Sequence, residues 1–372
     1  MSKMHVEVLV YIYLIVCLSM IGFNCACIIV FKRREKNVKK HAAHFSEEVR
    51  EQIKRLKNGE DIEEEHCRYL RRKLKRIGNL VAFDETLEAF SKESPVQVRQ
   101  YLNAISQVIL YLTLVYSKKR DNTVVTFFPY IISKYKILQG VSLGPVIEMM
   151  FNLVKSPSVY CRENALQALY STGDADCIVR AVKYIDENHI DHNAKLLTDG
   201  MLNFAGNAKY LQDRLWRELD SFSVPMKVTI LNYFRFGGFK EPERMLKLLE
   251  DETQNREIHF ACVRYFAKYP YEPAYALLLE MAGGDIGDGF EYAAIASTAL
   301  GSYPSEKTME VLKNNLHHKN WYIRFNSSQS LEKLGFTYQA MIDIMEGSDR
   351  YAREMLQYRL DQRNNQNGEA LV

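Results

Sequence analysis

The stretch SPSVYCRENALQAL, residues 156–169, decides the fold of this 372-residue chain, because its pattern returns about every 32 residues. In it a basic residue follows an apolar one, small residues lie three and six positions further on, and leucine lies at the seventh. The stretch WYIRFNSSQSL, residues 321–331, repeats this order. A fixed period of this length is typical of stacked helical hairpins. The sequence therefore predicts an all-α fold, an α-solenoid of helical hairpins.

The same register can be followed in both directions at steps of 31 to 34 residues. In each copy the apolar or small residues at the third, sixth and seventh positions form one helical face. Residues 94–99 resemble the start of the best copy, and a terminal copy is expected to begin at residues 349–353. We call the basic position of the pattern, Arg162 in the best copy, the marker position. In successive copies it is occupied by Arg162, Lys195, Lys227, His259, Ala293 and Arg324.

Proline at the start of the second helix and the order apolar-Arg-x-x-Ala-x-x-Ala-Leu resemble the HEAT-repeat family. The short period is similar to that of the bacterial, lyase-type HEAT-like repeats, and the resemblance covers about residues 85–360. Arg162 and Arg324 match the family's arginine, whereas the four markers between them depart from it. The resemblance implies that this arginine is structural and helps neighbouring repeats to stack. Arg162 and Arg324 are therefore assigned that role and no part in substrate binding.

The N-terminus has the features of a membrane anchor. From Val8 to Phe31, 24 consecutive residues carry no charge. As a helix they would span about 36 Å, enough for a hydrocarbon core of about 30 Å. A cleaved secretion signal is disfavoured, because the apolar run is too long and its basic residues follow it. We therefore expect a single transmembrane helix.

Basic residues flank the apolar run on one side. Only Lys3 precedes it. Because the basic residues are concentrated after the apolar run, we expect the N-terminus to lie outside and the repeat body to lie on the cytoplasmic side of the cell membrane. The residues that follow are also expected to attract anionic lipid headgroups. They are Lys32, Arg33, Arg34, Lys36, Lys39 and Lys40.

Four parts are predicted: an anchor (1–31), a basic juxtamembrane helical segment (32–80), the repeat body (81–360) and a disordered polar tail (361–372). The segment 32–80 holds 16 Lys and Arg against 9 Asp and Glu, although the whole chain is only +3. The repeat body therefore lacks the basic character of a nucleic-acid-binding domain. Within the basic segment a helix is expected to start at Ser46 and to stop at residues 58–61.

No catalytic, cofactor or metal site is predicted. Seven cysteines without paired spacings indicate reduced thiols. His189 and His192 could share a helical turn, but no further ligand follows at metal-site spacing, so we interpret them as loop histidines. The loop Gly283–Gly289 lacks the length and terminal Glu of a calcium loop and is interpreted as a connection between helices.

The predicted function is a membrane-anchored, cytoplasm-facing HEAT-like scaffold without enzyme activity. It would bind a protein partner through the concave face of the solenoid, and nucleic acid is not expected as a partner. A narrower hypothesis, from a resemblance to bacterial membrane-anchored HEAT proteins, is support of a membrane-bound cell-envelope enzyme complex. Two alternatives stay open. One is a lyase-type HEAT enzyme acting on a bound cofactor or chromophore, and the other is a lipid- or nucleic-acid-binding module that uses residues 32–80.

Overall fold

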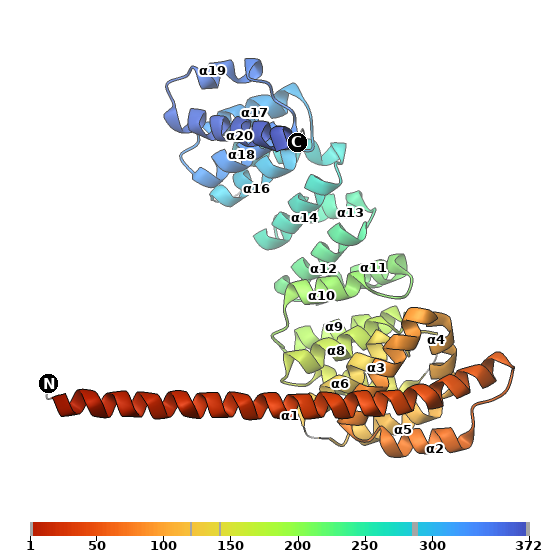
Figure 1. Cartoon of the computed structure of the whole chain (residues 1–372). Helices are drawn as coiled ribbons and strands as arrows, with labels where there is room; N and C mark the ends of the chain where they lie inside the picture. Colours follow the sequence, from red (N-terminus) through yellow and green to blue (C-terminus); the bar gives the residue numbers. More distant parts are fainter. Residues whose placement is uncertain (1–2, 120, 141–142, 285–288, 370–372) are drawn as a thin grey trace. The chain divides into compact units, whose positions relative to one another are not determined.

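The computed structural model describes residues 3–119, 121–140, 143–284 and 289–369, and in these ranges the chain is helical without a strand. The all-α prediction is confirmed. The chain forms two compact units, Met1–Asp174 and Ala175–Val372 (Figure 1). A boundary at this point differs from the predicted one at residue 80. Each helical hairpin contacts mainly its neighbours, so a repeat body can divide between any two hairpins.

The described residues of the first unit form eight helices. Its long helix α1 packs on α3 and α4, and the later helices pack in neighbouring pairs such as α5 with α7 and α6 with α8. The bounds are α1 Lys3–Lys57, α2 Glu64–Lys73, α3 Ile77–Glu93, α4 Pro95–Ala104, α5 Ser106–Tyr116, α6 Asn122–Lys134, α7 Gly144–Val154 and α8 Val159–Tyr170.

In the part of the second unit that the structure describes there are twelve α-helices and three short 3-10 helices. The α-helices are α9 Ala175–Glu187, α10 Ala194–Leu202, α11 Ala208–Arg217, α12 Val224–Gly237, α13 Pro242–Glu250, α14 Arg256–Lys268, α15 Tyr275–Gly283, α16 Phe290–Leu300, α17 Glu306–Leu316, α18 Trp321–Lys333, α19 Ile342–Met345 and α20 Arg350–Glu369. The 3-10 helices are η1 Leu219–Ser221, η2 Glu272–Ala274 and η3 Gln339–Met341.

The helices of the second unit are arranged in hairpins. Each even-numbered helix from α12 to α20 packs on the helix before it and on the even-numbered helix before that. We call α10, α12, α14, α16, α18 and α20 the even-helix layer. The marker residues from Lys195 to Arg324 all lie in this layer. The repeat period therefore corresponds to one hairpin, as predicted, while one solenoid across both units remains a prediction.

The small residues of the pattern are buried where neighbouring helices meet. Ala165, Ala168 and Leu169 of α8 are each fully buried, and so are Ser327 and Leu331 of α18. Short side chains let two helices approach closely, and the leucine fills the space between neighbouring helices. The repeat pattern thus encodes packing.

Helix α1 differs from its prediction in one respect. It runs without a break from Lys3 to Lys57, so the helix start expected at Ser46 is wrong. Val38, Phe45, Val49 and Ile53 are spaced by seven, four and four residues, and all are buried against the first unit. This apolar stripe lies on one helical face and keeps the helix intact through residue 46. The stop is confirmed, since Gly59 after the helix has a φ of 80°.

The division of the chain into four parts stays a prediction. Residues 32–57 continue the apolar segment as one helix and pack in the first unit. Leu70 of α2 is buried in the same unit. At the other end α20 continues to Glu369, past residue 361 where a disordered tail was expected. The residues of this region are polar but contain no proline, and a helix can therefore continue through them.

Candidate partner-binding surface

The apolar N-terminal part of α1 is exposed. Its large apolar side chains between Tyr11 and Phe31 are each about half to three-quarters exposed. Tyr11 and Phe31 themselves are both 66% exposed. By length and composition this helix could cross a membrane. In Figure 1 this part extends beyond the rest of the first unit. Fourteen large apolar side chains exposed in this way would be costly in water, which makes the segment a candidate for membrane contact.

The six basic residues after this segment are exposed as well, from Lys32 to Lys40. Lys39 forms an ion pair of 2.6 Å with Glu35 on the same helix. Val38 lies among them and is the first buried residue of α1 after the apolar segment. The basic turns therefore lie between the exposed apolar segment and the packed part of the first unit. Their contact with lipid stays a prediction.

The two predicted structural arginines make the same local contacts. The Arg162 Nη1 donates to the carbonyls of Ser156 and Pro157 at 2.8 and 3.2 Å. The Arg324 Nη1 donates to the carbonyls of His318 and Lys319 at 2.7 and 3.1 Å. These carbonyls belong to the turn before the arginine's own helix, so the guanidinium fixes the turn within one hairpin.

Contacts with the next hairpin occur at this position too. The Arg324 guanidinium lies 5.3 Å from the ring centre of Tyr351 in α20. At the equivalent position of α14, His259 lies 3.0 Å from the carbonyl of Asp251 in its own turn and 2.9 Å from the Tyr292 hydroxyl in α16. His259 therefore serves the purpose of the arginine that it replaces. A role of Arg162 in stacking stays a prediction.

A groove of about 610 Å³ crosses three neighbouring helices of the even-helix layer. Its residues come from α14, α16 and α18: Glu257, Phe260, Arg264, Phe290, Glu291, Ala294, Ile295, Thr298, Tyr322 and Asn326. We call it the aromatic groove. Phe290 is 41% exposed and Tyr322 is 58% exposed, and their rings stack with centres 6.1 Å apart. Exposed, stacked rings are typical of surfaces that bind another molecule.

One end of the aromatic groove carries two carboxylates and one cation. The Arg256 guanidinium lies 3.8 Å from carboxylate oxygens of both Glu257 and Glu291. All three side chains are at least one-third exposed. Their mutual energy is therefore small, and the three side chains together leave this end with one net negative charge.

The other end carries cations. Arg264 lines the groove, and Arg235 and Lys268 lie beside it on α12 and α14. The Arg235 guanidinium lies 4.3 Å from the ring centre of Phe236, and the Lys268 Nζ lies 5.5 Å from that centre. Burial, and next the charge of nearby Arg264, lower the pKa of Arg235. We call Arg235, Arg264 and Lys268 the cationic cluster.

The cationic cluster could not be recognised from a single repeat. Arg235 lies eight residues after its marker Lys227, and Lys268 lies nine residues after its marker His259. An alignment of the repeats on their marker residues would have placed Arg235 and Lys268 at nearly equivalent positions of neighbouring helices. Phe290 and Tyr322 likewise belong to different repeats. The site is formed across hairpins, where sequence spacing gives little signal.

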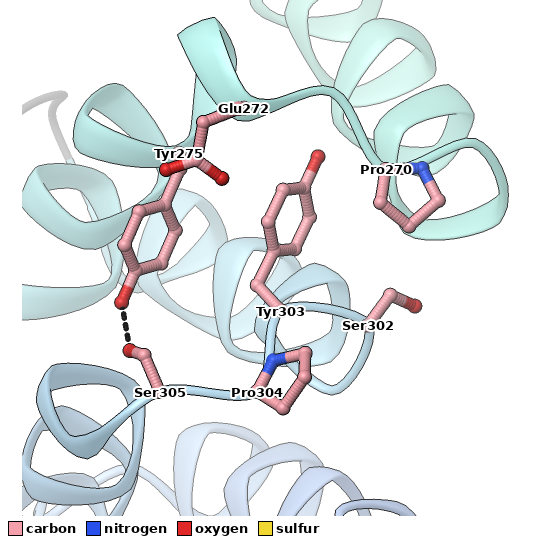
Figure 2. A pocket seen from close by; sticks show the side chains of 7 residues that line it. All are labelled: Pro270, Glu272, Tyr275, Ser302, Tyr303, Pro304 and Ser305. Carbon is pink, nitrogen blue, oxygen red and sulfur yellow. Dashed lines mark hydrogen bonds between the residues drawn. The ribbon is translucent and has the colours of Figure 1, made fainter.

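A second pocket, of about 500 Å³, lies where α15 and the turn before α17 meet (Figure 2). The rings of Tyr275 and Tyr303 stack with centres 5.6 Å apart. The Tyr275 hydroxyl is hydrogen-bonded to Ser305 and lies 2.9 Å from Thr308 Oγ1, and the backbone N–H of Tyr271 donates to the Tyr303 hydroxyl at 3.0 Å. Burial raises the pKa of Tyr303. These hydroxyls hold hairpins together and offer no activated nucleophile.

The histidines, cysteines and glycine loop considered from the sequence lie in three different places. His189 and His192 line a pocket of about 260 Å³ together with Asp186. In the described part of the chain no three His, Cys, Asp or Glu side chains are placed to hold a metal ion. Burial raises the pKa of the Cys262 thiol, so it is no ready nucleophile. Residues 285–288 of the Gly283–Gly289 loop lie outside the described residues.

The chain was compared with protein families, curated proteins and solved structures. No family model matches the chain, and no curated protein matches its sequence. A similar solved structure is human deoxyhypusine hydroxylase in complex with glycerol, at 14% identity and a TM-score of 0.28. The match covers 80% of this chain and 96% of that chain.

This comparison corrects one expectation. The similar structure is that of an enzyme, which contradicts the expectation of a protein without enzyme activity. That expectation is not carried further. At this identity and TM-score the likeness assigns no substrate, reaction or site residue to the chain.

Proposed function

We propose that this protein is a membrane-anchored HEAT-like protein that binds a protein partner on its even-helix layer, at the cytoplasmic side of the membrane. The observation that carries the proposal is the double character of α1. One helix has an exposed apolar half and a half that is buried in the first unit through Phe45, Val49 and Ile53. Such a helix would fix the first unit to the membrane without a flexible linker.

The proposed anchor holds the first unit near the lipid surface. From Phe31 to Val38, the first buried residue, there are seven residues, or about 10 Å of helix. The exposed cations of this interval would lie at the depth of the headgroups, where each basic residue contributes about 1 kcal/mol of attraction to anionic lipid. Their position after the apolar segment supports a cytoplasmic body.

The aromatic groove is the surface proposed for the partner. Its exposed rings are joined by Trp321 at 49% exposure and Tyr351 at 67% exposure on α18 and α20. Large aromatic side chains contribute much of the affinity of protein interfaces when they are covered. Here they lie on a rigid layer of packed helices, which lowers the entropic cost of binding.

A photo-crosslinking experiment tests this proposal. A crosslinking amino acid replaces Tyr322 in the full chain, expressed in its own membranes. The matched control is Tyr160, which is 80% exposed and likewise lies two residues before its marker arginine. We expect one protein species crosslinked from position 322 and not from position 160. Equal crosslinking at both positions, or none at 322, would contradict the proposal.

A further inference from the structure

In the described part of the chain, the cationic cluster has no acidic partner. Among the described residues, none of Arg235, Arg264 and Lys268 has a carboxylate oxygen within 4 Å, although many other cations of the second unit do. Lys268 Nζ instead donates to the carbonyl of Arg235 at 3.1 Å, as does the Tyr269 hydroxyl at 3.0 Å. These bonds hold the ends of α12 and α14 together and keep the cations close to one another.

Helix dipoles explain only part of this arrangement. Arg235 and Lys268 lie in the last turns of their helices, where a cation is stabilised by the carbonyl ends. Arg264 lies one turn earlier and lines the groove. Its charge disfavours the charged form of Arg235, so the two guanidinium groups repel each other. The Nε of Arg235 is also buried without a hydrogen-bond acceptor. An incoming anion would relieve the repulsion between the two guanidinium groups.

The rest of the groove identifies the kind of anion. Phe260, Phe290 and Tyr322 offer apolar surface next to Arg264, and Glu257 and Glu291 lie at the other end. A uniformly anionic polymer such as nucleic acid would meet these two carboxylates. A short peptide segment with an apolar side chain and a nearby carboxylate would match both the rings and the cations.

We propose that the aromatic groove binds an acidic peptide segment of the partner, with an apolar side chain among Phe290, Ile295 and Tyr322 and a carboxylate at Arg264 and Arg235. This inference rests on the proposed function and adds the chemistry of the partner. Charge complementarity of this kind speeds encounter and selects the partner, and its contribution weakens as salt is added.

The test uses the full chain in lipid nanodiscs and three fluorescent peptides of equal length. One has a Leu-Phe centre with Asp and Glu flanks, one has the same centre with Lys flanks, and one has a Ser-Ser centre with acidic flanks. We expect the first to bind most tightly, since it alone supplies both features. Arg264→Gln should weaken its binding about tenfold.

Arg244→Gln is the matched control. It removes the same charge from α13, outside the even-helix layer, where Arg244 lies near Asp213 and Glu241. We expect its affinity for the acidic peptide to stay within about twofold of the unsubstituted chain, in line with a surface charge remote from the site. Melting curves of both variants show whether the fold is kept.

The outcomes separate this inference from the proposed function. Equal binding of acidic and basic peptides, or an Arg264→Gln variant that binds like the unsubstituted chain, overturns the inference. Displacement of the peptide by an equally charged single-stranded oligonucleotide overturns it too, in favour of nucleic acid. Crosslinking from position 322 that persists in the Arg264→Gln variant with unchanged yield would keep the proposed function and reject the acidic segment. Loss of all crosslinking in the unsubstituted chain would reject the proposed function itself.

Discussion

The hydroxyl of Ser330 in α18 donates a hydrogen bond of 2.7 Å to the carbonyl of Ser297 in α16. Ser330 occupies the sixth position after its marker Arg324, where the repeat pattern requires a small residue. Gly301 lies opposite, at the end of α16. A Cβ added there would lie 2.8 Å from Ser330 Oγ and 3.1 Å from Ser330 Cα. Neighbouring hairpins therefore meet at a point where neither side has room for another methyl group.

The change Gly301→Ala should destabilise the second unit by about 1–3 kcal/mol, because the backbone of Ser330 cannot move aside as a flexible side chain could. Hydrogen–deuterium exchange of α16 and α18 should become faster by the corresponding factor. Gly78→Ala is the control, since an added Cβ meets nothing within 4 Å there. Unchanged exchange in Gly301→Ala would show that the hairpins do not pack this closely.

Loss of a marker arginine should loosen its own turn. Arg324→Met removes two hydrogen bonds from Nη1 to turn carbonyls and the contact with Tyr351, and we expect a loss of about 2–3 kcal/mol in the free energy of unfolding. Arg162→Asp should lower the melting temperature in the same way. The control is Lys195→Met at the equivalent, exposed position, with an effect within about 0.5 kcal/mol. If all three variants melt together with the unsubstituted chain, the marker position has no structural role.

Stability of the first unit should depend on the protonation of His66. Its Nε2 lies 2.8 Å from the Tyr101 hydroxyl and its Nδ1 lies 3.4 Å from Glu48. Burial lowers the pKa of His66, and Glu48 and Glu63 offset this only in part. The unfolded chain therefore binds the proton more readily than the folded one. Stability from this group is complete above about pH 6.5 and is lost as the pH falls toward the folded pKa.

A pH series on two variants checks this dependence. Between about pH 7.5 and 5, the unsubstituted chain should lose more stability than His66→Gln, in which no imidazole titrates. His41→Gln removes an exposed histidine from the same unit and should keep the original pH dependence. A pH dependence that His66→Gln leaves intact would assign the effect to other groups.

The repeat could be predicted from the sequence because its signal is local. The spacing of Ala165, Ala168 and Leu169 places them on one face of a single helix, and all three are buried. The helix start expected at Ser46 was wrong because burial of the apolar stripe that includes Phe45 and Val49 outweighs the capping preference of Ser46. Tertiary packing therefore determines that α1 continues through residue 46, and the local sequence alone does not show this.

The candidate site could not be predicted, for the opposite reason. Arg235, Arg264 and Phe290 come from three repeats and become neighbours only when α12, α14 and α16 pack together. None of them is unusual within its own repeat. The marker arginines, which are the most regular residues, hold turns instead. Regularity in this chain reports on packing, and binding is expected where the repeats differ.

The central claim, that α1 anchors the body in a membrane, is tested most directly by carbonate extraction of membranes carrying the full chain. Leu18→Lys with Ile21→Lys places two charges in the middle of the exposed apolar segment, at a cost of about 3 kcal/mol each in a bilayer. Val96→Lys changes an equally exposed apolar residue of the body and serves as control. We expect the unsubstituted chain and Val96→Lys to stay in the membrane pellet while the double variant is released. Release of the unsubstituted chain, or retention of the double variant, would contradict it.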